Sequence, residues 1–226
     1  MPRYPGRRLP NRRVIRFKIG CPRSMEDIYS RHAQHFFAQY QSLRFEDVHR
    51  HWLVHLPSQQ AFALDIGAGS GRDAAALAAR GWDVLAVEPA AELRKLGEQA
   101  TRGQSVQWLD DRLPDLQHVR ALSYRFQLIL VSAVWMHLPP TQRERAFRIL
   151  TDLLAPGGVL VVTLRHGPGD GERQFFEVNA EELERWARQR ALVSVYAGRD
   201  EDQLQRDAAW WETLVFRLPT DQASRL

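Results

Sequence analysis

Three glycines behind a short apolar run are the first residues whose spacing suggests chemistry. Gly67, Gly69 and Gly71 alternate in "ALDIGAGSG", residues 63–71. Glycine costs conformational entropy, so this density indicates a backbone that turns sharply or is closely approached. Such a turn between a strand and a helix presents backbone N–H groups to a cofactor that carries a nucleoside. A glycine-rich turn without a ligand is the alternative.

The glycine spacing separates two classes of cofactor. A dinucleotide-binding turn has the pattern Gly-x-Gly-x-x-Gly, which would require a third glycine where this chain has Arg72. The chain instead has Asp65, Gly67, Gly69 and Gly71 at alternate positions. We therefore do not expect NAD to bind.

The apolar periodicity predicts alternating strands and helices. Two amphipathic helices are predicted from the spacing of Tyr29 to Tyr40 and of Phe45 to Leu56. Strands are predicted near 62–66, 83–87, 105–109, 126–132, 159–164, 192–197 and 211–217, and further helices near 72–80, 90–101, 140–154 and 180–190. This alternation predicts an α/β fold with a mainly parallel sheet covered on both faces. We expect one domain over 25–218, with N-terminal helices at 25–57 and a core at 61–218.

The charge of the chain is unevenly distributed. Residues 1–23 carry eight basic side chains and no acidic one, and the rest carries 23 basic against 27 acidic side chains. A basic disordered tail is predicted over 1–24, and a C-terminal tail over 219–226. Because the basic excess belongs to the tail, we do not expect a nucleic acid as partner. The single cysteine, Cys21, excludes a disulfide framework and a cysteine-rich zinc site. No metal and no membrane partner are expected, and a cytoplasmic location fits.

Several motifs in a fixed order resemble those of the class I S-adenosylmethionine-dependent methyltransferases. They are "LDIGAGSG", "VLAVEPA", "VQWLDDRLPDL" and "LLAPGGVLVVTL", and the resemblance covers about residues 60–218. The stretch "GSGRDAAALAARGWDVLAVEPA" is similar to small bacterial members that act on small molecules. The family implies a Rossmann-like, doubly wound sheet of seven mainly parallel strands with an antiparallel last strand, and N-terminal helices that form a lid. It also implies S-adenosylmethionine as cofactor and S-adenosylhomocysteine as product.

The resemblance also implies which residues hold the cofactor. Glu88 offers two acceptor oxygens to the two ribose hydroxyls. Asp110 or Asp111 is expected near the adenine amino group, and Asp110 is favoured. Asp65 is expected to orient the amides of the loop or to reach the amino group of the cofactor through water. Asp73 is expected to cap the helix that follows. The other expected cofactor-binding residues are Gly67, Ala68, Gly69, Gly71, Pro89 and Ser132.

The acceptor is expected beyond the fourth strand, at Ser132–His137. Methyl transfer is an in-line displacement that needs alignment in a dry pocket, and a general base helps where the acceptor carries a proton. His137 is the best candidate for that base. Gln127 stands where many family members have Asp, a position that serves the end of the strand. The remaining candidates for lid or acceptor contacts are Tyr29, Tyr40, Trp135 and His166.

Three functions fit the sequence. The preferred one is methylation of a small-molecule acceptor by an S-adenosylmethionine-dependent methyltransferase. The second is methylation of RNA or protein, for which the basic tail is the only support. The third is a cofactor-binding module without turnover. The sequence specifies neither the acceptor atom nor the oligomeric state.

Overall fold

The computed structural model describes residues 25–58, 60–169, 172–173, 175–204, 206 and 208–220. The predictions for the tail at 1–24, for Cys21 and for the last residues of the chain therefore lie outside the described residues. Among the described helices, none combines the length and the apolar character that a membrane span requires.

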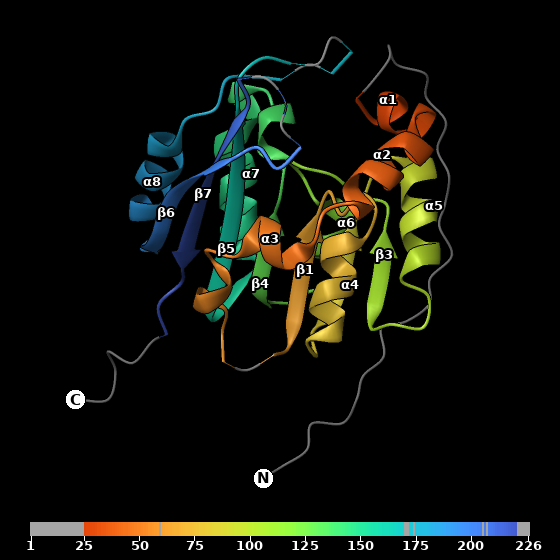
Figure 1. The fold of residues 1–226 in the computed structure, drawn as a ribbon. Helices are drawn as coiled ribbons and strands as arrows, with labels where there is room; N and C mark the ends of the chain where they lie inside the picture. The colour runs from red at the N-terminus through yellow and green to blue at the C-terminus, as the bar shows by residue number, and fades with distance from the viewer. Residues whose placement is uncertain are drawn as a thin grey trace, which may run out of the picture.

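A seven-stranded sheet forms the centre of the fold (Figure 1). Its strands are β1 (Phe62–Ile66), β2 (Asp83–Val87), β3 (Val106–Leu109), β4 (Phe126–Val131), β5 (Leu154–His166), β6 (Val193–Glu201) and β7 (Trp210–Arg217). They follow the order β3-β2-β1-β4-β5-β7-β6, in which β7 runs antiparallel to both of its neighbours. The predicted mixed sheet is confirmed. The chain reverses its direction of winding between β1 and β4, which is where such sheets bind ligands.

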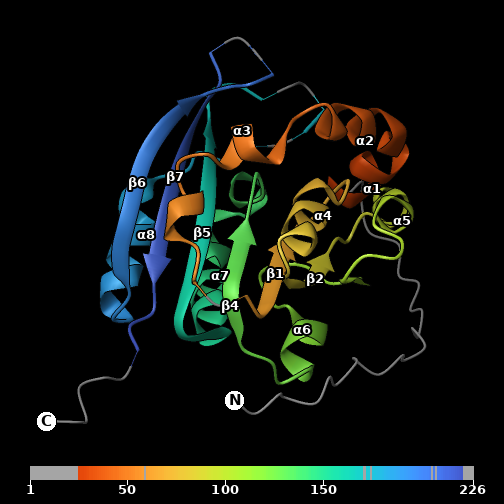
Figure 2. The same cartoon turned by 60° about the horizontal axis from the view of Figure 1, so that its bottom comes forward.

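Helices cover both faces of the sheet (Figure 2). One face carries α3 (Phe45–His49), α4 (Arg72–Ala79) and α5 (Ala91–Ala100), and the other carries α6 (Gln117–Ala121), α7 (Pro140–Asp152) and α8 (Ala180–Gln189). The strands are apolar on both sides because both faces are covered. In β4, for example, Leu128, Ile129, Leu130 and Val131 are all fully buried.

The helices of residues 25–41 lie above one end of the sheet, at the top of Figure 1. The first predicted helix is divided at His32 into α1 (Met25–Arg31) and α2 (Ala33–Gln41). The second is shorter than its apolar pattern suggested, and consists of α3 followed by a 3-10 turn at Leu53–His55. Phe36 of α2 packs against Leu93 of α5, which attaches this layer to the rest of the fold.

Two further elements differ from the prediction. Helix α6 was not predicted, because five residues are too few for a periodic pattern. Strand β5 begins at Leu154, whereas a helix was predicted to end near 154 and the strand to begin near 159. Gly157 there has a φ of +76°, and the register of β5 against β4 is irregular between Phe126 and Leu128. The segment between the predicted helix and the predicted strand is thus the irregular beginning of the strand.

Candidate cofactor and acceptor site

A cavity of about 340 Å³ lies at the carboxyl ends of the parallel strands. Residues that follow β1, β2, β3 and β4 line it, together with residues of β5, β7 and the N-terminal helices. Its volume is at the lower end of the range of about 300–1,000 Å³ found for small-molecule sites.

The glycine turn forms one wall of the cavity. Gly67 and Gly69 line it with φ angles of +67° and +53°, which other residues rarely adopt. A Cβ atom on Gly67 would lie 2.4 Å from Cγ2 of Val134. Gly71 does not line the cavity but begins α4 with a φ of +77°, and a Cβ there would lie 2.9 Å from Trp108. The first two glycines therefore shape the cavity, whereas the third serves packing.

Glu88 lies at the end of β2 with its carboxylate held by the backbone. One carboxylate oxygen accepts from the N–H of Gly69 at 3.0 Å, and the other accepts from the N–H of Ala90 at 2.8 Å. The residue is 6% exposed, and burial raises the pKa of Glu88 to about 7 although these hydrogen bonds lower it. Each oxygen keeps lone pairs for further donors, which suits a pair of neighbouring hydroxyl groups.

The two aspartates after β3 have different surroundings. The side chain of Asp110 is 43% exposed and forms an ion pair with Arg94 at 3.2 Å, outside the cavity. Asp111 is buried and lines the cavity, and one of its oxygens accepts from the N–H groups of His118 and Val119 at 2.8 and 2.9 Å. The structure therefore places Asp111, and not the favoured Asp110, beside the site.

Asp65 and Asp73 are buried carboxylates near the glycine turn. Asp65 does not line the cavity, and among the described residues its Oδ2 has no hydrogen-bond partner. Burial raises the pKa of Asp65, as does the charge of Asp73. The prediction that Asp73 caps α4 was wrong, because its carboxylate is bonded to Arg72 at 2.6 Å and to His49 at 3.0 Å, and Gly71 occupies the N-cap without a side-chain bond.

Tyr29 and His137 meet at the other end of the cavity, under the N-terminal helices. The Tyr29 hydroxyl lies 3.0 Å from Nε2 of His137 and accepts a hydrogen bond from Nη1 of Arg173 at 3.1 Å. Tyr40 also lines the cavity, and its ring stacks on that of Phe36 with centroids 5.9 Å apart. The four candidates Tyr29, Tyr40, His137 and Ser132 thus lie on one cavity wall or another.

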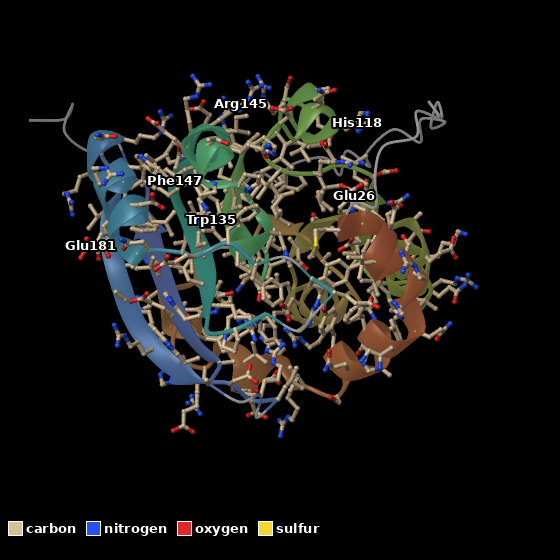
Figure 3. All side chains as sticks on the ribbon, turned by 90° about the horizontal axis from the view of Figure 1, so that it is seen from above. Glu26, His118, Trp135, Arg145, Phe147 and Glu181 are labelled. Atoms are coloured by element: carbon tan, nitrogen blue, oxygen red, sulfur yellow. The ribbon has the colours of Figure 1, made fainter. Side chains whose placement is uncertain are left out.

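Two residues that were predicted to contact the methyl acceptor lie away from the cavity. Trp135 is fully buried and packs in the core cluster that also contains Phe147, and both are labelled in Figure 3. His166 stacks on Trp210 with ring centroids 3.8 Å apart, and its Nε2 lies 3.2 Å from Glu212. Neither lines the cavity, because Trp135 points into the core and His166 faces its neighbour on β7.

Two arginines at the cavity were not identified from the sequence. Arg165, near the end of β5, alternates with Thr163, and this period of two after an apolar run was a usable signal. Arg173 follows β5 in a segment without periodicity, so no signal marked it. Pro89 and Ala68, which were predicted to contact the cofactor, also line the cavity. The side chain of Gln127 accepts from the N–H of Phe62 at 3.2 Å, and so joins the beginning of β1 to β4.

The residues at the cavity fit a cofactor that carries a nucleoside. The glycine turn leaves room for close approach, and Glu88 presents a carboxylate to it. Asp111 uses only one bond on its Oδ1, to the N–H of Arg112 at 2.9 Å, so acceptor capacity remains there.

Comparison with known proteins agrees with this chemistry. Residues 63–158 match the family model of a methyltransferase domain. No curated protein matches the chain.

Solved structures resemble the whole fold. The N-methyltransferase NodS from Bradyrhizobium japonicum WM9 is 22% identical over 81% of this chain and 97% of its own, with a TM-score of 0.58. A 1,6-didemethyltoxoflavin-N1-methyltransferase from Burkholderia thailandensis, solved with its substrate and S-adenosylhomocysteine, is 20% identical over 89% and 93%, with a TM-score of 0.56. A TehB-like S-adenosylmethionine-dependent methyltransferase from Corynebacterium glutamicum is 18% identical over 82% and 97%, with a TM-score of 0.60.

Proposed function

We propose that this chain, a class I S-adenosylmethionine-dependent methyltransferase, methylates a small molecule in the cavity under α1 and α2. The single observation that carries the proposal is that α1 and α2 cover the cavity. Met25, Glu26 and Tyr29 of α1 and Tyr40 of α2 line the same cavity as Gly67 and Glu88. A site covered in this way, with a volume of about 340 Å³, favours a small acceptor over a segment of RNA or protein.

Three parts of the cavity would hold S-adenosylmethionine. Glu88 would hold the ribose hydroxyls, Asp111 would hold the adenine, and the turn from Gly67 to Gly69 would hold the part between ribose and methionine. When bound, the cofactor supplies an electrophilic methyl group on a sulfonium. The chain contributes alignment and exclusion of water, which are the main requirements of such a transfer.

Tyr29 and His137 provide a route for the proton of an acceptor such as an amine or a hydroxyl. Arginine has donors only, so the Tyr29 oxygen accepts from Arg173. When His137 carries its proton on Nδ1, Tyr29 donates its own proton to Nε2 of His137. The acceptor gives its proton to the Tyr29 oxygen as Tyr29 gives its proton to His137. Burial raises the pKa of Tyr29, which keeps the hydroxyl protonated before the reaction.

Transfer of a labelled methyl group tests the proposal. The full chain is incubated with methyl-labelled S-adenosylmethionine and a cell extract. Ultrafiltration separates labelled protein and RNA from the small molecules, and chromatography then removes unreacted S-adenosylmethionine from the small-molecule fraction. Label is expected in the small-molecule fraction, and it should fall by about 100-fold or more in Tyr29→Phe and His137→Gln, while S-adenosylhomocysteine still binds. Tyr196→Phe, on β6 and outside the lining of the cavity, is the matched control. Label only in protein or RNA would contradict the proposal, and no transfer with intact cofactor binding would favour a module without turnover.

A further inference from the structure

Arg165 is a buried cation at the acceptor side of the cavity. It lies on β5, opposite Trp211 of β7 in the antiparallel register, and it is 5% exposed. Thr163 and Thr213 line the cavity from the same two strands. The mechanism proposed above gives Arg165 no role.

The guanidinium of Arg165 uses only one of its ends within the protein. Its Nη1 donates to the carbonyl oxygen of Pro168 at 2.8 Å and to that of Gly167 at 3.4 Å. Its Nε is buried and has no hydrogen-bond partner among the described residues. Its Nη2 also donates no hydrogen bond to any described residue. The edge formed by Nε and Nη2 is the fork that binds the two oxygens of a carboxylate.

The charge of Arg165 is not balanced by an ion pair within the part of the chain that the structure describes. The nearby buried carboxylate, Asp202, is occupied by other donors. It accepts from Nε of Arg206 at 3.0 Å and from Nε1 of Trp211 at 2.7 Å. Burial opposes its ionisation, but these hydrogen bonds hold the pKa of Asp202 at about 2. Burial and the charge of Arg206 lower the pKa of Arg165, so a ligand anion would relieve an unfavourable charge.

The order of the strands places Arg165 away from the cofactor residues. The residues assigned to the cofactor follow β1, β2 and β3 in the chain. In the sheet, β4 lies between β1 and β5. Neighbouring strands are about 4.8 Å apart, so β5 lies roughly 10 Å from β1. Aromatic rings surround this end of the cavity, since the Arg165 guanidinium lies 4.7 Å from the ring centroid of Phe175 and Trp211 also lines it.

We propose that Arg165 binds a carboxylate of the methyl acceptor, which makes the acceptor a small organic acid with an aromatic or apolar body. One guanidinium edge with two donors matches the two oxygens of a carboxylate. The inference rests on the proposed function, because it assumes that the acceptor occupies this end of the cavity.

Binding of matched acids and amides tests the assignment without requiring turnover. Benzoate and phenylacetate, and their neutral amides, are titrated into the full chain saturated with S-adenosylhomocysteine, with tryptophan fluorescence as the signal. The acids are expected to bind about tenfold or more tightly than the amides, and Arg165→Met should abolish the difference. Arg165→Lys keeps the charge but loses the fork, so an intermediate preference is expected.

A matched control and the contrary outcomes complete the experiment. Arg112→Met removes another cation that lines the cavity, and it should leave the preference for acids unchanged. Equal binding of acids and amides, or binding of none of them, would overturn the assignment. Weaker binding of S-adenosylhomocysteine in Arg165→Met would also overturn it, because Arg165 would then hold the carboxylate of the cofactor. Failure of the wild-type chain to bind S-adenosylhomocysteine would instead contradict the proposed function.

Discussion

The ionisation of Glu88 makes cofactor binding depend on pH. Burial raises its pKa from 4.5 to about 7 in the protein without cofactor. The ribose hydroxyls are donors, so they need the ionised carboxylate as acceptor. Raising the pH through 7 therefore increases the fraction of molecules that can bind.

The size of the effect follows from this pKa. Glu88 is about one tenth ionised at pH 6 and about nine tenths ionised at pH 8, and the apparent Kd scales inversely with that fraction. S-adenosylhomocysteine should thus bind about tenfold more tightly at pH 8, and binding at pH 6 should release nearly one proton.

The stability of the fold should show the opposite trend with pH. The folded state keeps a proton that the unfolded chain loses near pH 4.5, so the contribution of Glu88 to stability falls as the pH rises from 4.5 to about 7.

Calorimetric titration of S-adenosylhomocysteine across this pH range, in buffers of different ionisation enthalpy, measures both the affinity and the proton release. Glu88→Gln is the control, since it keeps an acceptor but does not titrate. Its profile should be flat, with an affinity at pH 8 about tenfold below that of the wild type. A flat wild-type profile, or a pH dependence that persists in Glu88→Gln, would refute this reasoning.

Three further predictions concern the scaffold. Gly97→Ala should lower the free energy of unfolding by about 1–3 kcal/mol, although alanine favours helices. The reason is that its Cβ would lie 2.3 Å from Trp108. An unchanged midpoint in denaturant unfolding would contradict this prediction. His49→Leu should lower the free energy of unfolding by about 2–3 kcal/mol. The buried His49 ring accepts a hydrogen bond from Trp52 at 2.9 Å and is bonded to Asp73 at 3.0 Å, and both bonds would be lost. His51→Leu, at an exposed histidine, is the control. A chain that begins at Met25 should keep its affinity for S-adenosylhomocysteine, and one that begins at Gln60 should lose it. Loss of affinity in the Met25 chain would show that the tail belongs to the site.

The sheet could be predicted because its strands carry strong local signals. The bounds predicted for β1 and β2 are those observed, since each is a short apolar run that ends at a turn or a charge. The glycine turn and Glu88 lie together at the cavity because the carboxyl ends of adjacent parallel strands meet at one edge.

The remaining features depend on contacts between residues distant in sequence. Asp111 is drawn inward because it accepts hydrogen bonds from the beginning of α6, which the sequence did not predict. Trp135 follows a strand whose end lines the cavity, but the 3-10 turn there directs its ring into the core. Arg165 is a candidate ligand-binding residue because no carboxylate among the described residues pairs with it. A local sequence pattern does not show whether such a partner is present.

A crystal structure of the full chain with S-adenosylhomocysteine tests the central claim most directly. We expect the ribose hydroxyls on the Glu88 carboxylate, the adenine beside Asp111, and the sulfur directed toward the end of the cavity that Tyr29, His137 and Arg165 line. A ribose held by other residues, or a cofactor carboxylate on Arg165 that fills the acceptor end, would contradict it.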